Sequence, residues 1–200
     1  MDINLNEISI TEISQLNHPL TEAIKELKSA SDAIQKMADI GVGNFHIYDR
    51  SWRDFLHSID RFWNKVISTC NKEKKWQTLN SKYSQLRKKD PLLNYLMQAR
   101  NASEHTISPV IKEWDANLRA EPTPSGINLK WNPWDRPLLP INNRGTVFQP
   151  PKKHLGKTLQ HYREKRIGVE EPRVAAELSM IFYLNAFNEI DQALFKNKME

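Results

Sequence analysis

The chain has 200 residues, 39% of them hydrophobic and 26% charged, and its 29 Lys and Arg against 24 Asp and Glu give a formal net charge of +5. This length and composition suit one globular domain with a real core and argue against wholesale disorder. Cys70 is the only cysteine, which excludes an internal disulfide and a cysteine-based zinc site and is typical of a reducing compartment.

The sequence also lacks the features of a targeted or membrane-spanning chain. Residues 1–7 contain no basic start followed by an apolar core, so no signal peptide is predicted. No apolar run approaches the roughly 20 residues that a membrane span requires. We therefore expect a cytoplasmic protein with no membrane partner.

Residues 11–38 show a heptad pattern. One set of apolar residues recurs every seven positions, namely Ile13, Leu20, Leu27 and Ile34. Leu16, Ala23, Ala30 and Met37 interleave with them, as in an a/d seam. Pro19 interrupts the pattern, so either the helix starts there with Asn17 as its cap or two helices meet at a kink. The seam predicts packing within a bundle, with a separate partner helix as the alternative.

Apolar residues at spacings of three and four predict further helices over about residues 49–70, 74–88 and 169–196, and a shorter helical stretch over 110–118. The helix over 49–70 carries Trp52, Phe55 and Phe62, whose large rings suit the centre of the core. Short connections between successive helices favour antiparallel neighbours.

Residues 120–168 differ in character, because they hold seven of the chain's 11 prolines. Residues 127–131 alternate as in a strand, and the turn-like residues 142–145 precede a second expected strand over 146–148. Aromatic residues in this segment (Trp131, Trp134 and Phe148) could stack on bases or pin a long loop to the domain. The predicted fold class is all-α: an antiparallel up-and-down bundle of four to five helices, formed by residues 1–119 and 169–200, with a Pro-rich insertion containing a β-ribbon over 120–168.

Basic residues concentrate in two runs. Residues 72–89 hold seven Lys or Arg against one Glu, and residues 144–166 hold the same numbers. Such runs are typical of a solvated face or loop, or of a surface that binds a polyanion such as RNA. The candidate RNA-contacting residues are Lys74, Lys75, Arg87, Lys152 and Lys153.

The most informative stretch is residues 90–107. Asp90 can cap the start of a helix, and Pro91 suits the first helical position. An apolar stripe follows, and then a polar cluster of Arg100, Asn101, Ser103, Glu104 and His105. Asn101 and His105 share one helix face, as do Arg100 and Glu104, because each pair is four residues apart. Pro109 predicts that the helix bends or ends just past this cluster.

The run Arg100-Asn-Ala-Ser-Glu-His105 resembles the Arg-x(4–6)-His signature of the HEPN superfamily, in the form in which a polar residue, commonly Asn, follows the Arg. The resemblance covers residues 11–118 and 169–196 and not the insertion. It implies an up-and-down helical bundle, usually dimeric, whose active members are RNA endonucleases that need no metal or other cofactor.

The resemblance also implies a role for each residue of the cluster. His105 would act as general base on the RNA 2′-hydroxyl, Arg100 would hold the scissile phosphate, and Asn101 would position one of the two groups, with Ser103 and Glu104 in support. The products would be a 2′,3′-cyclic phosphate and a 5′-hydroxyl. Many such enzymes are toxins or phage-defence effectors, so an antitoxin or other regulatory protein is the implied partner.

A homodimer follows from helix geometry together with the resemblance. Five residues along an α-helix turn the direction by about 140° and advance it by about 7.5 Å. Arg100 and His105 of one chain therefore do not easily meet at one phosphate. In the family, two-fold symmetry brings the motifs of both chains to a shared cleft, which implies an isologous interface built from this helix.

A second match to the signature exists, because six residues separate Arg50 from His57. Three features favour Arg100: Asn101 follows it, leucine-rich turns precede it, and Pro109 alters the helix after it. Arg50 instead stands at the start of the aromatic helix expected over 49–70.

Two other functions remain open. One is a non-catalytic HEPN-like bundle that binds RNA or a protein partner, in which Arg100 pairs with Glu104 and His105 bonds a neighbouring helix. The other is a structural protein assembled through the heptad seam. Metal hydrolysis is not expected, because the histidines form no i, i+4 pair and His46 with Asp49 supplies only two ligands. The sequence also lacks the glycine-rich loops that bind nucleotides.

Overall fold

The computed structural model describes residues 18–40, 44–105, 111, 118–123, 126–131, 153–158 and 172–196. Within these ranges the helices are α2 (Thr21–Asp39), α3 (Phe45–Cys70), α4 (Trp76–Lys89), α5 (Pro91–His105) and α7 (Pro172–Leu194). The strands are β1 (Leu118–Thr123), β2 (Gly126–Trp131), β3 (Lys153–His154) and β4 (Lys157–Thr158). β1 pairs with β2 and β3 with β4, both antiparallel. The predominantly helical class predicted from the sequence is confirmed.

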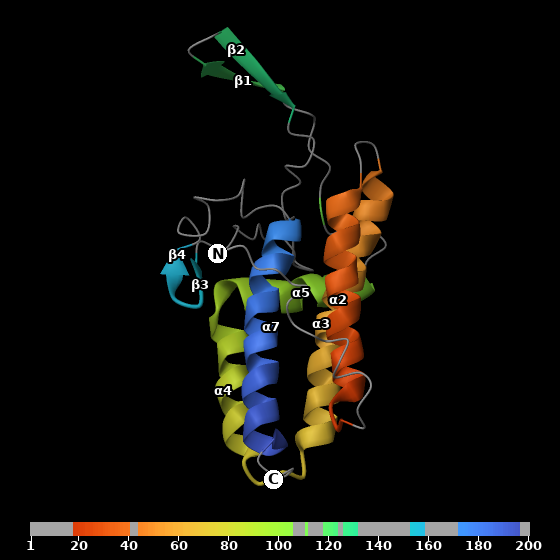
Figure 1. Cartoon of the computed structure of the whole chain (residues 1–200), viewed down its shortest axis with the longest axis vertical. Helices are drawn as coiled ribbons and strands as arrows, with labels where there is room; N and C mark the ends of the chain where they lie inside the picture. Colours follow the sequence, from red (N-terminus) through yellow and green to blue (C-terminus); the bar gives the residue numbers. More distant parts are fainter. Residues whose placement is uncertain are drawn as a thin grey trace.

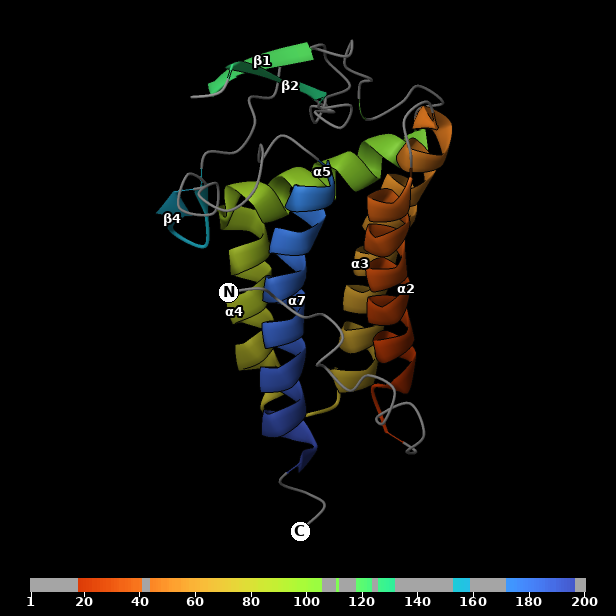
Figure 2. The same ribbon diagram turned by 45° about the horizontal axis from the view of Figure 1, so that its top comes forward.

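The long helices α2, α3, α4 and α7 lie side by side and alternate in direction along the chain (Figure 1). α5 crosses one end of this group, as the turned view shows (Figure 2). α2 packs most extensively on α3, and α7 contacts each of the other four helices. Because α5 rests on α3, α4 and α7, the position of its side chains is set by three other helices.

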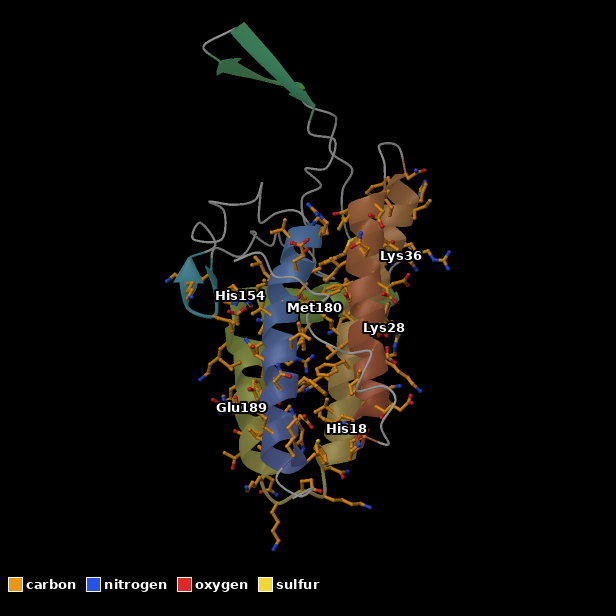
Figure 3. The ribbon with its side chains drawn as sticks, viewed as in Figure 1. His18, Lys28, Lys36, His154, Met180 and Glu189 are labelled. Atoms are coloured by element: carbon orange, nitrogen blue, oxygen red, sulfur yellow. The ribbon has the colours of Figure 1, made fainter. Side chains whose placement is uncertain are left out.

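The heptad residues of α2 are buried, as the seam predicts, over the part that the structure describes. They are Leu20, Ala23, Leu27, Ala30, Ile34 and Met37. α2 begins just after Pro19, at Thr21, without a side-chain cap at Leu20. Residues 11–17 lie outside the described residues, so a cap by Asn17 and a kink between two helices both stay predictions. The Leu20 N–H donates to His18 Nδ1 at 3.1 Å, so His18 Nε2 carries the ring proton and donates to Asp191 Oδ1 at 2.8 Å. His18 thereby joins the start of α2 to the end of α7 (Figure 3).

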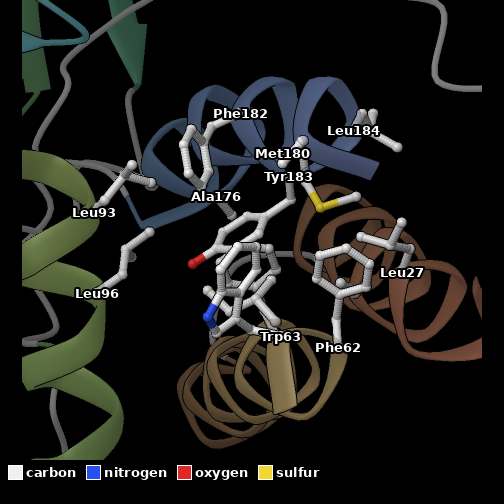
Figure 4. Close-up of a cluster of buried hydrophobic side chains, with 14 of the residues drawn as sticks. Leu27, Phe62, Trp63, Leu93, Leu96, Ala176, Met180, Phe182, Tyr183 and Leu184 are labelled. Atoms are coloured by element: carbon white, nitrogen blue, oxygen red, sulfur yellow. The ribbon is translucent and has the colours of Figure 1, made fainter. Parts of the chain in front are cut away.

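Aromatic side chains of α3 form the centre of the core, as their spacing predicts. Trp52, Phe55 and Phe62 are fully buried. The Phe62 ring meets the Tyr183 ring of α7 edge to face, with centroids 5.9 Å apart (Figure 4). Such pairs add stability beyond the area that they bury. α3 starts earlier than expected, at Phe45.

The start of α5 is fixed by a buried network around Asp90. The Asp90 Oδ1 atom accepts hydrogen bonds from the Leu92 and Leu93 N–H groups, both at 3.0 Å, so the predicted N-cap is confirmed. It also receives His154 Nδ1 at 2.9 Å, and Oδ2 accepts from the Leu155 N–H. Burial alone would raise the pKa of Asp90, but the hydrogen bonds from His154, Leu155 and Leu93 together lower it.

One expectation outside the long helices needs correction. The helical stretch expected over 110–118 is wrong at its two described positions, because Ile111 lies in a β-bridge and Leu118 begins β1. Leu118–Thr123 pairs with Gly126–Trp131 in a hairpin, and the alternation predicted the second of these strands over 127–131. The short strands β3 and β4 had no periodicity to reveal them. The strand expected over 146–148 lies outside the described residues.

Candidate functional site

The polar cluster of the sequence lies on the last turns of α5, where the helix packs on α3. Ala99 and Ala102 face the core, 0% and 6% exposed, which directs the neighbouring residues outward or toward α3. Arg100, Asn101, Ser103 and Glu104 therefore gather at one end of the helix. His105 is the last residue of α5, and its side chain lies outside the described part of the structure.

Arg100 is held by two carboxylates. Its Nη2 lies 3.2 Å from Asp60 Oδ2 on α3, and its Nη1 lies 2.8 Å from Glu104 Oε2 one turn further along α5. Nη1 also donates to Asn101 Oδ1 at 3.2 Å. The Nε atom is buried and makes no hydrogen bond to a described residue. The side chain of Arg100 is 27% exposed, so part of the guanidinium remains open to a solute.

His57 of α3 completes the cluster from the other side. Its Nε2 lies 3.4 Å from Ser103 Oγ, and its Nδ1 lies 4.0 Å from Glu104 Oε1. The Ser103 hydroxyl itself donates to the Arg100 carbonyl at 2.7 Å. The carboxylate of Glu104 thus stands between a guanidinium and an imidazole.

The electrostatics of the cluster favour a neutral imidazole at neutral pH. Partial burial lowers the pKa of His57, and the positive charges of Arg100 and Arg61 lower it further, against the opposing effects of Glu104 and Asp54. A neutral imidazole close to pH 7 can accept a proton, which is the property required of a general base.

Arg53 ties the two helices together beside the cluster. Its Nε binds Asp49 Oδ2 at 2.9 Å, and its Nη1 donates to the Ser103 carbonyl at 3.2 Å. Carbonyls in the last turn of a helix have no intrahelical partner, so a guanidinium there satisfies one of them and suits the negative end of the helix dipole. This contact fixes the C-terminal end of α5 against α3.

The basic residues expected to contact RNA do not form one surface. Arg87 is buried, its guanidinium stacks 5.0 Å from the Trp63 ring centroid, and its Nη2 lies 3.9 Å from Asp60. The assignment of Arg87 to an exposed basic face is therefore wrong, because it is a core cation. Lys74 and Lys75 are exposed in the α3–α4 turn, at the opposite end of the long helices from α5 (Figure 1). Lys153 is exposed on β3, and Lys152 lies outside the described residues.

Across the described residues, no group of three or more His, Cys, Asp or Glu side chains could hold a metal ion. None of the helices in this part of the chain is long and apolar enough to cross a bilayer. No family model, no curated protein and no solved structure matches this chain.

Sequence reasoning missed two members of the cluster. His57 was noticed only as part of the Arg50 match, and Asp60 was not singled out. The available signal was their spacing, since residues three apart on a helix share a face and these two lie among aromatic positions that face the core. Nothing in the local sequence shows that this face meets Arg100.

Proposed function

We propose that the protein is a metal-independent RNA endonuclease of the HEPN type, working as a homodimer and held in check by an antitoxin or other regulatory partner. The observation that carries the proposal is the placement of Arg100, partly exposed, beside Asn101, Ser103 and Glu104 at the C-terminal end of α5. That end of a late helix is where the Arg-x(4–6)-His signature stands in the superfamily. An up-and-down helical bundle with α5 at the dimer interface is part of the proposal.

The reaction needs only side chains. His105 takes the proton from a ribose 2′-hydroxyl, the 2′-oxygen attacks phosphorus, and the bond from phosphorus to the 5′-oxygen breaks. The 5′-oxygen receives a proton from water, and a 2′,3′-cyclic phosphate remains on the other fragment. Arg100 binds the phosphate oxygens with its planar fork and stabilises the charge of the five-coordinate transition state. DNA is spared because it has no 2′-hydroxyl.

One observation favours a second function, a non-catalytic bundle that binds RNA or a protein. Asp60, Glu104 and Asn101 already occupy both terminal nitrogens of Arg100, as they would for an arginine that only joins two helices. A phosphate must replace at least one carboxylate before Arg100 can act. In the non-catalytic alternative this exchange does not occur, and the exposed Lys74 and Lys75 carry the binding.

The test is incubation of the purified protein with a mixed RNA pool in excess EDTA, with end-group analysis of the fragments. We expect 2′,3′-cyclic phosphate ends from the wild type and none from Arg100→Ala or His105→Ala. Arg50→Ala is the matched control, because Arg50 is an exposed arginine of α3 that belongs to the second motif match. Cleavage that requires added metal, or that survives in Arg100→Ala, would contradict the proposal.

A further inference from the structure

The cluster contains an imidazole that the HEPN-type mechanism leaves unused. His57 comes from α3 of the same chain, and Glu104 links it to Arg100. The two oxygens of that one carboxylate approach Nη1 of Arg100 at 2.8 Å and Nδ1 of His57 at 4.0 Å. A carboxylate spans only a few ångströms, so the cation and the imidazole lie on the same side of α5.

The groups that face the two ring nitrogens of His57 determine which nitrogen can accept a proton. Nδ1 faces a carboxylate, which favours a proton on Nδ1 and leaves the lone pair on Nε2. Nε2 faces Ser103 Oγ at 3.4 Å, which is long for a hydrogen bond. The Ser103 hydroxyl already donates its hydrogen to the Arg100 carbonyl at 2.7 Å. The lone pair on Nε2 therefore receives no strong hydrogen bond from the Ser103 hydroxyl.

The exposure of His57 and the charged groups around it are those of a reacting group rather than of a core histidine. The side chains of His57 and Glu104 are 29% and 37% exposed. The titratable groups that face His57 are Glu104 and Arg100 on α5 and Asp54 and Arg61 on α3. The two acids and the two arginines oppose each other, so partial burial decides the direction, and the pKa of His57 is lowered.

From this geometry we infer that His57 is a further acid–base residue of the site, which Glu104 orients and which acts with Arg100 on one phosphate within a single chain. The inference rests on the proposed RNA cleavage and replaces one assignment in it, because the 2′-hydroxyl proton goes to His57 of the same chain and not to His105. A guanidinium and an imidazole that share one carboxylate need no second chain to meet at a phosphate.

In the reaction, the substrate hydroxyl binds between Ser103 and His57. Nε2 of His57 takes the 2′-hydroxyl proton as the 2′-oxygen bonds to phosphorus, and the phosphorus–5′-oxygen bond breaks. Nδ1–H stays directed at Glu104, which stabilises the imidazolium that forms. The 5′-oxygen takes its proton from water, and the imidazolium later returns its proton to solvent. The phosphate displaces Asp60 from Nη2 of Arg100.

The first experiment measures the pKa of His57 by NMR titration of the imidazole signals, in the wild type and in Glu104→Gln. Glu104 raises this pKa through its charge, so we expect Glu104→Gln to lower it. His46, an exposed histidine in the first turn of α3, supplies the internal reference signal. An unchanged His57 titration would overturn the contact with Glu104 whether or not the protein cleaves RNA.

The second experiment measures RNA cleavage as a function of pH. A general base must be neutral, so kcat/KM should rise with pH through the His57 pKa found by NMR and level off above it. The rise should move to lower pH in Glu104→Gln. His57→Ala and His57→Gln should lose about 100-fold or more in kcat with little change in KM, the effect of losing a general base, and His46→Ala should lose nothing.

Mixing experiments separate one-chain from two-chain action. Arg100→Ala and His57→Ala chains, mixed in equal amounts, should stay inactive if both residues act in one chain. Restored activity would place His57 against a partner's Arg100 and overturn the inference. Cleavage by His57→Ala within a few-fold of the wild type would overturn the inference alone. Absence of cleavage by the wild type would overturn the proposed function and, with it, this role for His57.

Discussion

The buried pair of Asp90 and His154 offers a sharp test of how α5 is held in place. The side chains are 3% and 1% exposed. His154 Nδ1 faces Asp90 Oδ1 at 2.9 Å, and His154 Nε2 faces the Leu178 carbonyl at 3.2 Å. Both partners are acceptors, and Asp90 Oδ1 also receives the N–H groups of Leu92 and Leu93, so both ring nitrogens of His154 face acceptor oxygens, the arrangement that suits an imidazolium.

The perturbation is Asp90→Ala, which removes a helix cap and a buried counter-ion together. Loss of an N-cap costs about 0.5–2 kcal/mol, and leaving one partner of a buried ion pair alone costs about 3–5 kcal/mol. The two losses overlap because one carboxylate makes both contacts. We expect the free energy of unfolding to fall by about 3–5 kcal/mol, a large part of the roughly 5–15 kcal/mol of an ordinary domain.

Asp90→Asn separates the two contributions. The amide oxygen still accepts the Leu92 and Leu93 N–H groups, so the cap persists while the counter-ion is lost, and the destabilisation should be smaller than for Asp90→Ala. The assay is urea unfolding followed by tryptophan fluorescence at pH 7. A double-mutant cycle with His154→Ala should give a coupling of about 0.5–3 kcal/mol.

The pH dependence has a definite sign. The pKa of Asp90 is lower in the folded chain than its ordinary value of 3.8. The Asp90 carboxylate therefore contributes its full stability above that value and loses it as pH falls through the folded pKa. The gap in unfolding free energy between wild type and Asp90→Asn should shrink below about pH 4. A gap that stays constant from neutral pH to strong acid, or a loss under about 1 kcal/mol in Asp90→Ala, would show that Asp90 does not hold the start of α5 through these contacts.

Three further results follow from burial and charge. Leu93→Ala should reduce the unfolding free energy by about 2–5 kcal/mol in urea denaturation, because this side chain is fully buried beside α7 and its loss leaves a cavity; a loss under about 1 kcal/mol would mean that the core there is loose. Cys70 should react with a thiol reagent at pH 8 far more slowly in the folded than in the urea-unfolded chain, because the thiol is 0% exposed and burial raises its pKa to about 12; equal rates would contradict its burial. If Lys74 and Lys75 bind RNA, changing both to Glu should weaken RNA binding at low salt. It should also reduce the slope of log K against log salt by about 0.7 per lost contact on single-stranded RNA. Lys28→Glu, at an exposed position of α2, should do neither, and equal effects would mean that only net charge matters.

Local sequence signals predicted the elements that depend on them. The spacing of apolar residues located α3, α4, α5 and α7 to within a few residues, and Asp90-Pro91 located the start of α5. These signals are reliable because helix periodicity, capping and the effect of proline act within about one or two turns of the chain. The same signals failed at Leu118, where a strand partner outweighed a helix-like apolar spacing.

At the candidate site, too, some features follow from local sequence and others from tertiary packing. Sequence spacing alone places Arg100, Asn101, Ser103 and Glu104 together at the end of one helix, because their separation along α5 is fixed. What surrounds them depends on tertiary packing, since α3 packs on α5 across about forty residues of chain and brings His57 to Ser103 and Glu104 and Asp60 to Arg100. Packing also buried Arg87, which the charge run had placed on the surface. A contact between distant segments depends on the whole core, and no local pattern of residues encodes it.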